Sequence, residues 1–344
     1  MKQYEKYMKQ CIKLAQKAIG KTSPNPMVGC VILSPEGKVI STGYHKHYGE
    51  NHAERDALLK IENSKNATLI VNLEPCSHYG KTPPCADLII EKGIKKVVYG
   101  MRDPNPLVCG KGLKKLEKAG IEIIGPVLED ECKKLNEVFF KNQTKHQIFV
   151  ALKTATTIDG KIATSTGDSK WITSQKARNE VKNIRAQYDA ILTSSKTIIA
   201  DNPSMIHKNK IILDTNLKTT TDFNIYKTGK IYIYNSIKSE IKGNYKYIKT
   251  PIRGEYLDIE FILSDLYNQG FMSILVESGG TLNGGFLPYI DKLYHFIAPK
   301  ILSDNTGLSC FSGAQADKIS QCFNLKYETT KCYDHDILNI YSKV

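Results

Sequence analysis

Four residues carry the clearest chemistry in this sequence: a histidine, a glutamate and two cysteines. His52 and Glu54 belong to the segment NHAERDALLK, and Cys76 and Cys85 are the first and last residues of CSHYGKTPPC. One imidazole and two thiolates would supply the three protein ligands of a catalytic zinc site, whose fourth position is left for water. Zinc lowers the pKa of such a water to about 7, and Glu54 can carry its protons. The four residues therefore predict hydrolytic deamination.

The cysteine spacing differs from the general signature of zinc deaminases, which is H-x-E followed by P-C-x-x-C with a glutamate that is not a ligand. This chain has H-A-E, but eight residues separate its cysteines. We interpret the insertion SHYGKTPP as a substrate loop, with His78 in substrate contact or loop structure. The alternatives are a structural site with His78 as a fourth ligand, cysteines that only pack, and a chance H-A-E triplet.

The elements expected around these residues bring them together. We predict a helix over 52–61 with Asn51 as its N-cap, a buried strand from 67 that ends at Cys76, and a helix over 84–92 that begins near Cys85. The other elements expected in this half are a helix over 4–20, a hairpin of strands over 27–34 and 39–45, a strand from 96, a helix over 110–120 and a strand over 121–127. This alternation predicts a three-layer α/β sandwich.

A second alternation of strands and helices follows a polar stretch at 141–147, which we interpret as a linker. Strands are predicted over 148–155, 189–194, 210–214, 230–234, 245–249, 272–277 and 292–298, and helices over 174–187, 259–269 and 281–288. The length of 344 residues fits two domains. We therefore predict two α/β domains, 1–145 and 146–344.

A glycine-rich stretch, VESGGTLNGGF, follows the predicted strand that ends at Glu277. Backbone N–H groups at such a turn can bind a cofactor phosphate, and a tight turn without a ligand is the alternative. The spacing is not G-x-G-x-x-G, which excludes a Rossmann domain.

The composition restricts the setting of these sites. The formal charge is +13, but the lysines are scattered in ones and twos, which favours a solvated surface over a nucleic-acid or membrane surface. No stretch approaches about 18 apolar residues, and no signal region is recognisable, so we expect a cytoplasmic protein. Its nine cysteines are then expected to be reduced, which disfavours a disulfide between Cys76 and Cys85. A homo-oligomer is left open.

Four motifs of the first half, TSPNPMVGCVI, GYHKHYGENHAE, EPCSHYGKTPPC and RDPNPLVCGKG, resemble the deaminase half of the bifunctional riboflavin-biosynthesis deaminase/reductases. The resemblance implies a cytidine-deaminase-like three-layer α/β/α domain. It also implies deamination of 2,5-diamino-6-ribosylamino-4(3H)-pyrimidinone 5′-phosphate to the aminouracil. The residues that it assigns to this substrate are Asn25, His45, Lys81, Asp103 and Asn105, each with a turn or cap role as the alternative.

From residue 147 the chain is similar to the reductase half of the same family. The resemblance implies a dihydrofolate-reductase-like α/β domain in which NADPH reduces the ribosyl group to a ribityl chain. The residues implied to face the cofactor are Ala155, Trp171, Thr197, Asp201, Gly279, Gly280, Thr281, Leu282, Asn283, Gly284 and Gly285. Those implied to face the substrate are Ser169, Arg185, Met205, Lys208 and Glu277. Without the resemblance, Trp171 reads as a core residue and Arg185 as a surface charge.

The reductase half departs from the family pattern at Lys208, where the family has an arginine that meets the substrate phosphate. A lysine keeps the charge but loses the planar grip of a guanidinium, so we expect weaker phosphate binding or a contribution from His207. The loop after Pro203 also looks short.

Two other functions fit this sequence less well. A nucleic-acid base deaminase would need a basic channel lined with aromatic residues and has no use for a second nucleotide-binding half. A non-enzymic regulator would not be expected to keep the complete set of His52, Glu54, Cys76 and Cys85. We predict a bifunctional enzyme with Zn²⁺ and NADPH as cofactors, a phosphorylated pyrimidine as substrate, and no nucleic-acid or membrane partner.

Overall fold

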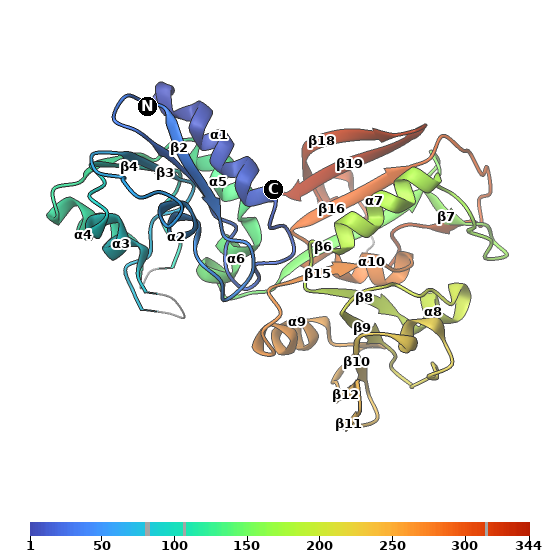
Figure 1. The fold of residues 1–344 in the computed structure, drawn as a ribbon. Helices are drawn as coiled ribbons and strands as arrows, with labels where there is room; N and C mark the ends of the chain where they lie inside the picture. The colour runs from blue at the N-terminus through green and yellow to red at the C-terminus, as the bar shows by residue number, and fades with distance from the viewer. Residues whose placement is uncertain (80–82, 106–107, 314–315) are drawn as a thin grey trace. The chain divides into compact units, whose positions relative to one another are not determined.

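The computed structural model describes residues 1–79, 83–105, 108–313 and 316–344. The chain forms two compact units, Met1–His146 and Gln147–Val344 (Figure 1). Each unit combines helices with a sheet that contains parallel strands, which confirms the predicted α/β class. Within the described ranges no helix combines the length and the apolar character that a bilayer span requires.

The first unit is built on a five-stranded sheet with the strand order β2-β1-β3-β4-β5. The strands are β1 (Gly29–Leu33), β2 (Val39–Tyr44), β3 (Thr68–Val71), β4 (Lys96–Tyr99) and β5 (Glu122–Ile124). The helices are α1 (Lys2–Gln16), α2 (Ala53–Leu58), α3 (Cys85–Glu91), α4 (Lys111–Lys118), α5 (Glu129–Leu135) and α6 (Glu137–Lys145). β1 is antiparallel to β2 and β3, whereas β3, β4 and β5 are parallel. All the elements predicted for this half are present. Most are shorter than predicted: the strand expected to reach Cys76 ends at Val71, whereas α1 begins earlier than expected, at Lys2.

Two glycines let helices approach opposite faces of this sheet. A Cβ at Gly29 would come within 2.1 Å of the Cys11 carbonyl oxygen in α1, and a Cβ at Gly43 within 2.4 Å of the Ala53 oxygen in α2. Gly43 pairs with Cys30, the neighbour of Gly29, so the two glycines face opposite sides. This places α1 and α2 in different layers, as the predicted three-layer sandwich requires.

The linker predicted at 141–147 is wrong, because α6 continues to Lys145. Its polar composition suggested a coil, but a helix needs only one apolar face, and Phe139 and Phe140 are both partly buried. Neither α5 nor α6 was predicted. The compact unit thus ends at His146 with a helix instead of a flexible segment.

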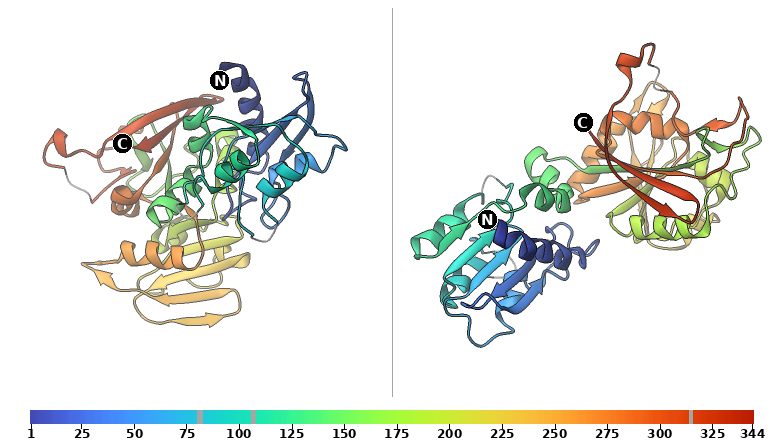
Figure 2. Two further views of the ribbon diagram at one scale, coloured as in Figure 1. Left: turned by 90° about the vertical axis from the view of Figure 1, so that its left-hand side faces the viewer. Right: turned by 90° about the horizontal axis from the view of Figure 1, so that it is seen from above.

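The second unit contains a ten-stranded sheet with the order β11-β12-β10-β9-β8-β15-β6-β16-β19-β18, which Figure 2 shows from two further sides. Its strands are β6 (Phe149–Thr156), β8 (Ala190–Ser194), β9 (Asn209–Leu213), β10 (Lys230–Asn235), β11 (Glu240–Lys242), β12 (Tyr245–Lys249), β15 (Ser273–Val276), β16 (Lys292–Ile297), β18 (Leu325–Tyr333) and β19 (Asp336–Lys343). The strands from β12 to β16 are parallel, and β11, β19 and β18 add antiparallel pairs at the two edges. The seven predicted strands are confirmed.

The helices of this unit are α7 (Gln175–Arg185), α8 (Ser195–Asp201), α9 (Ile259–Asn268) and α10 (Gly280–Phe286). One apolar cluster joins Ile262 of α9 and Phe286 of α10 to the sheet, and a second joins Ile198 of α8 to Ile191 and Ile212. Two small sheets complete the unit: β7 (Lys161–Ala163) with β17 (Leu308–Ser309), and β13 (Ile252–Arg253) with β14 (Tyr256–Leu257). α8 and the β18–β19 hairpin were not predicted.

Candidate active sites

The three predicted metal ligands of the first unit meet in the structure. The Nδ1 atom of His52 lies 3.5 Å from the Sγ atoms of both Cys76 and Cys85, and the three ligand atoms are all within 4.8 Å of one another. Cys85 is the first residue of α3, and its backbone N–H donates to the Cys76 sulfur at 3.3 Å. One nitrogen and two sulfurs fit zinc, with a position left for water. His78 is not part of this group of described residues.

The start of α2 differs from the prediction, because His52 and not Asn51 is the N-cap residue. The extended backbone of His52 turns its ring towards the cysteines at the point where the helix begins, with φ −66° and ψ 161°. Asn51 instead uses its backbone oxygen, which accepts a hydrogen bond from Nδ1 of His45 at 3.1 Å.

Glu54 follows the ligand His52 by two residues, in the first turn of α2, and is 3% exposed. Burial, together with the neighbouring Cys76 sulfur, raises the pKa of its carboxyl group to about 7. The pKa of the Cys76 thiol is lowered by hydrogen bonds from Cys85 and His52, which favours the thiolate that a metal needs. A carboxyl group that changes protonation near neutral pH is suited to acid and base catalysis.

A cavity of about 330 Å³ opens beside the ligands. Four of the residues predicted to hold the deaminase substrate line it together with Glu54: Asn25, His45, Asp103 and Asn105. The fifth, Lys81, lies outside the described residues. The lining also includes polar or aromatic residues to which no role was assigned from the family, namely Tyr48, Glu50, Glu74, His78, Phe139 and Gln143. The structure thus gathers the predicted residues around one space without testing what each of them binds.

The tautomer of His45 follows from its two hydrogen bonds. Its Nδ1 faces the Asn51 carbonyl, which can only accept, so Nδ1 carries the hydrogen and Nε2 accepts from the Asn25 amide at 3.3 Å. Burial lowers the pKa of His45, which keeps the ring neutral. The Asn25 amide is thereby held with its nitrogen towards His45 and its oxygen away from it.

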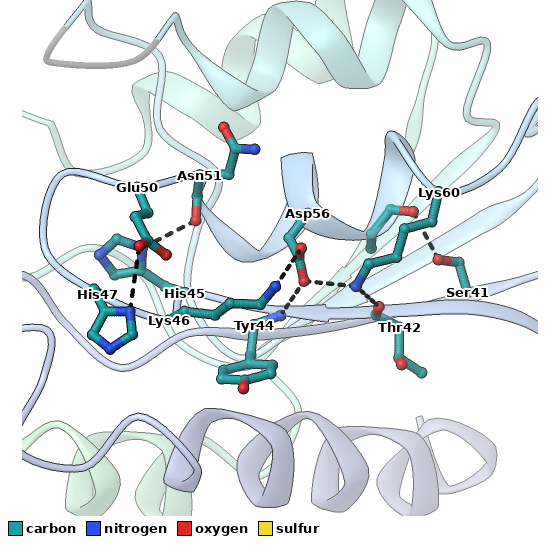
Figure 3. A network of polar contacts seen from close by, with 11 residues as sticks. Ser41, Thr42, Tyr44, His45, Lys46, His47, Glu50, Asn51, Asp56 and Lys60 are labelled. Atoms are coloured by element: carbon teal, nitrogen blue, oxygen red, sulfur yellow. Dashed lines mark hydrogen bonds and ion pairs between the residues drawn. The ribbon is translucent and has the colours of Figure 1, made fainter.

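Asp56 ties the two ends of the loop between β2 and α2 together, as Figure 3 shows. Its Oδ2 atom accepts from the Tyr44 N–H at 3.2 Å and from Lys60 at 2.8 Å, and Lys60 also donates to the Thr42 carbonyl at 2.9 Å. Tyr44 immediately precedes His45. This carboxylate therefore fixes the strand end that carries His45 against the helix that carries Glu54.

Glu74 fastens the loop that contains Asp103 and Asn105. Its side chain is 3% exposed and accepts four backbone N–H bonds: Oε2 from Asp103 at 3.3 Å and Gly110 at 2.9 Å, and Oε1 from Gly112 at 3.0 Å and Leu113 at 3.4 Å. Asp103 in turn accepts from the Asn105 N–H at 2.9 Å. A Cβ at Gly112 would lie 2.0 Å from the Pro75 oxygen, so only glycine allows this approach. Glu74 thus connects the Cys76 segment to the predicted substrate loop.

A Glu74→Gln substitution is expected to raise the deaminase KM about 10-fold, because an amide keeps only one acceptor oxygen and turns its NH₂ group towards two N–H donors. The expected change in kcat is smaller, since no ligand of the metal is altered. Steady-state ammonia release and the zinc content of the purified protein measure both effects. Glu117→Gln, on the exposed face of α4, is the matched control. An unchanged KM would contradict the role given to Glu74.

In the second unit, two residues predicted to face the substrate form an ion pair with each other. Nε and Nη2 of Arg185 donate to the two oxygens of Glu277 at 2.6 and 2.9 Å, and Nζ of Lys153 lies 3.6 Å from Oε2. Burial alone would raise the pKa of Glu277, but the charges of Arg185 and Lys153 outweigh it, and the pKa is lowered. Arg185 is not a free surface charge. Lys153 was not predicted, although a lysine inside the apolar run IFVALKTA was a usable signal.

Four residues outside the glycine loop are predicted to face the cofactor, and they lie at different places in the second unit. Thr197 lies in a cluster of hydroxyl groups, 3.1 Å from Ser278 and 3.1 Å from Ser194. Ala155 lies near the end of β6, two strands away from β8 in the sheet. Asp201 accepts from the Ser169 hydroxyl at 3.4 Å. Trp171 is 63% exposed, with the Arg178 guanidinium 4.4 Å from the ring centre, so it is not a core residue.

The glycine loop is only partly open. Cβ atoms at Gly280 and Gly284 would lie 2.3 and 2.0 Å from the carbonyl oxygens of Ser309 and Ser312, so these glycines allow close packing of the chain on itself. Asn283 is fully buried and donates to the Cys310 carbonyl at 2.9 Å, and Leu282 packs on the core. Of the remaining residues of this loop, Thr281 and Gly285 are exposed and Gly279 is partly exposed.

Lys208 and Met205 are not brought to Glu277. Lys208 immediately precedes β9, whereas Glu277 immediately follows β15. Both strands run parallel to β8, so the two residues lie at opposite ends of the parallel strands. Met205 is 6% exposed and packs with Ile198. The ring of His207 is engaged with the backbone of Asn209 and Tyr188. The short loop leads directly into β9, which explains why this segment does not reach the end of the strands where Glu277 lies.

Comparison with known proteins gives the same division of the chain. Residues 1–101 match the family model of the cytidine and deoxycytidylate deaminase zinc-binding region, and residues 148–338 match that of the RibD C-terminal domain. The riboflavin biosynthesis protein RibD of Actinobacillus pleuropneumoniae is 37% identical, covering 96% of this chain and 93% of its own. The protein of that name from Escherichia coli K12 is 36% identical, covering 97% and 98%.

A solved structure agrees over almost the whole length. The crystal structure of a diaminohydroxyphosphoribosylaminopyrimidine deaminase/5-amino-6-(5-phosphoribosylamino)uracil reductase from Thermotoga maritima has a TM-score of 0.90 and 39% identity, and the match covers 99% of each chain. Acinetobacter baumannii RibD, form 1, has a TM-score of 0.89 and 32% identity.

Proposed function

The chain belongs to the RibD family and is a bifunctional deaminase and reductase of riboflavin biosynthesis, and from this premise we propose the substrate of each unit and the residues that act on it. Met1–His146 hydrolyses the 2-amino group of 2,5-diamino-6-ribosylamino-4(3H)-pyrimidinone 5′-phosphate. Gln147–Val344 then reduces the ribosyl group of the aminouracil with NADPH. The observation that carries the proposal is the convergence of His52, Cys76 and Cys85 beside a cavity lined by Glu54.

In the deaminase unit, His52, Cys76 and Cys85 would hold zinc, which when bound supplies the Lewis acid that activates water. Glu54 takes one proton from the water and delivers it to the ring nitrogen as the hydroxyl adds to the ring carbon. It then transfers the remaining proton of that hydroxyl to the amine, so that the carbon–nitrogen bond breaks, ammonia leaves and the carbonyl forms. Its pKa of about 7 allows both halves of this transfer. Neutral His45 orients the Asn25 amide towards the substrate.

In the reductase unit, NADPH when bound supplies the reducing equivalents, and the protein positions the ribosylamino group. Thr197 and the accessible Gly279, Thr281 and Gly285 lie where backbone and hydroxyl groups can meet the cofactor. Glu277 stays ionised between two cations, so it can accept a hydrogen bond from a ribose hydroxyl. Lys208 is left out of this proposal, because it lies at the other end of the parallel strands from Glu277. A cytoplasmic location and the absence of nucleic-acid or membrane partners stay predictions.

Removal of zinc is expected to separate the two activities. A chelator should abolish ammonia release from the pyrimidine substrate, and added Zn²⁺ should restore it, because the deaminase ligands are in one unit. NADPH oxidation with the deaminated substrate should be unchanged, since none of the residues proposed for reduction is a metal ligand. Metal analysis together with separate assays of ammonia and NADPH checks this. A zinc-free protein that still deaminates would refute the proposal.

A further inference from the structure

One wall of the deaminase cavity comes from α6, which lies beyond the residues that match the zinc-binding deaminase region. Phe139 and Gln143 both line the cavity. They are four residues apart in a helix, so their side chains project from the same face. α6 can be located in Figure 1 just before the end of the first unit.

This wall is held in place by a hydrogen-bonded asparagine. Asn136, which immediately precedes α6 and is 3% exposed, accepts from the Met27 N–H at 2.7 Å and donates to the Met27 carbonyl at 3.0 Å. Asn72 donates to the same carbonyl at 3.0 Å and accepts from the Gly29 N–H at 2.7 Å. The start of α6 is therefore fixed against the segment that carries Asn25.

The Gln143 amide has the chemistry of a ligand contact. It lines the cavity, is partly buried, and makes no side-chain hydrogen bond to another residue in the described part of the chain. An amide offers a donor and an acceptor side by side, which complements the adjacent C=O and N–H groups of a pyrimidinone edge. Phe139 offers an apolar ring of the kind on which a pyrimidine can stack.

We propose that Phe139 and Gln143 are specificity-determining residues of the deaminase, which contact the pyrimidinone ring of the substrate from α6. This inference rests on the deaminase function proposed above and adds to it the residues that recognise the ring. Asn136 is a positioning residue, since it reaches the cavity wall and the Asn25 segment without lining the cavity itself.

The test uses Gln143→Met and Phe139→Leu in the full-length, zinc-loaded protein. In Gln143→Met the side chain keeps its length but loses its hydrogen-bonding groups. This variant should raise the deaminase KM about 10-fold, as expected for a lost hydrogen bond, with kcat changed by less than about 3-fold. Phe139→Leu removes the stacking ring and should raise the deaminase KM about 5-fold or more. Zinc content and NADPH oxidation should match the wild type. Gln16→Met, the same change on the exposed end of α1, is the control.

The outcomes separate the inference from the function on which it rests. A wild-type protein that releases no ammonia from the pyrimidine phosphate would overturn the proposed function. A wild-type enzyme that deaminates while both variants keep its KM would overturn the inference alone. Loss of kcat together with zinc, at unchanged KM, would also overturn it, because the wall would then only support the metal site.

Discussion

A Glu54→Gln substitution is expected to reduce ammonia release by at least ~100-fold, the contribution typical of a positioned general acid and base. Glutamine fills the same space in the buried position beside His52 but cannot take up or release a proton at neutral pH. The cavity shape and the three ligands are unaltered, so zinc content should equal that of the wild type. Ammonia release at saturating substrate and metal analysis measure the two quantities.

The second unit supplies an internal control for this experiment, because the proposed NADPH oxidation on the deaminated substrate is expected to be independent of Glu54. Glu62→Gln, an exposed glutamate shortly after α2, is the matched variant on the same unit. Deamination by Glu54→Gln at the wild-type rate, with zinc bound, would remove Glu54 from the mechanism.

A Glu277→Gln substitution is expected to have a comparable effect on reduction. It leaves Arg185 and Lys153 close together without the carboxylate between them, and losing one partner of a buried ion pair costs about 3–5 kcal/mol. The second unit should therefore unfold about 10 °C lower, at roughly 2–4 °C per kcal/mol. Loss of a charged hydrogen bond to the ribose, worth about 1.5–3 kcal/mol, should lower kcat/KM for NADPH oxidation by ~10-fold to ~150-fold.

Two comparisons separate stability from catalysis in this variant. Assays well below the unfolding temperature remove the contribution of unfolded protein, and ammonia release reports on the first unit in the same sample. Glu255→Gln, an exposed change in the same unit, is expected to leave both activities unchanged. Full reductase activity of Glu277→Gln would exclude Glu277 from substrate binding.

The metal site could be predicted from the sequence because its chemistry needs few residue types at recognisable places. His52 and Cys85 lie at the starts of α2 and α3, and Cys76 lies in the segment that follows β3, so the fold brings the three together. Glu74 could not be assigned in this way. Its role depends on a loop some 30 positions later in the chain, although a glutamate at the end of an apolar strand was a signal of a buried carboxylate.

The reductase half was harder to predict for physical reasons that differ from residue to residue. Gly280 and Gly284 looked like a phosphate loop, but a glycine is equally required where two segments of backbone touch, and only the structure distinguishes these cases. The position of Lys208 depends on the length of the loop before it. This loop is short and places Lys208 at the start of β9, at the other end of the parallel strands from Glu277. β18 was missed because most of its residues are exposed, so no apolar alternation marked it as a strand.

The position of α6 also decides where this protein can be divided. A gene fragment that ends near residue 101 would encode His52, Cys76 and Cys85 but not Asn136 or the cavity face of α6. Such a fragment keeps the means to bind a metal and loses part of the means to choose a substrate. In recombination between enzymes, the transferable deaminase module therefore ends at His146, and the helix nearest to the junction is inherited with the first activity.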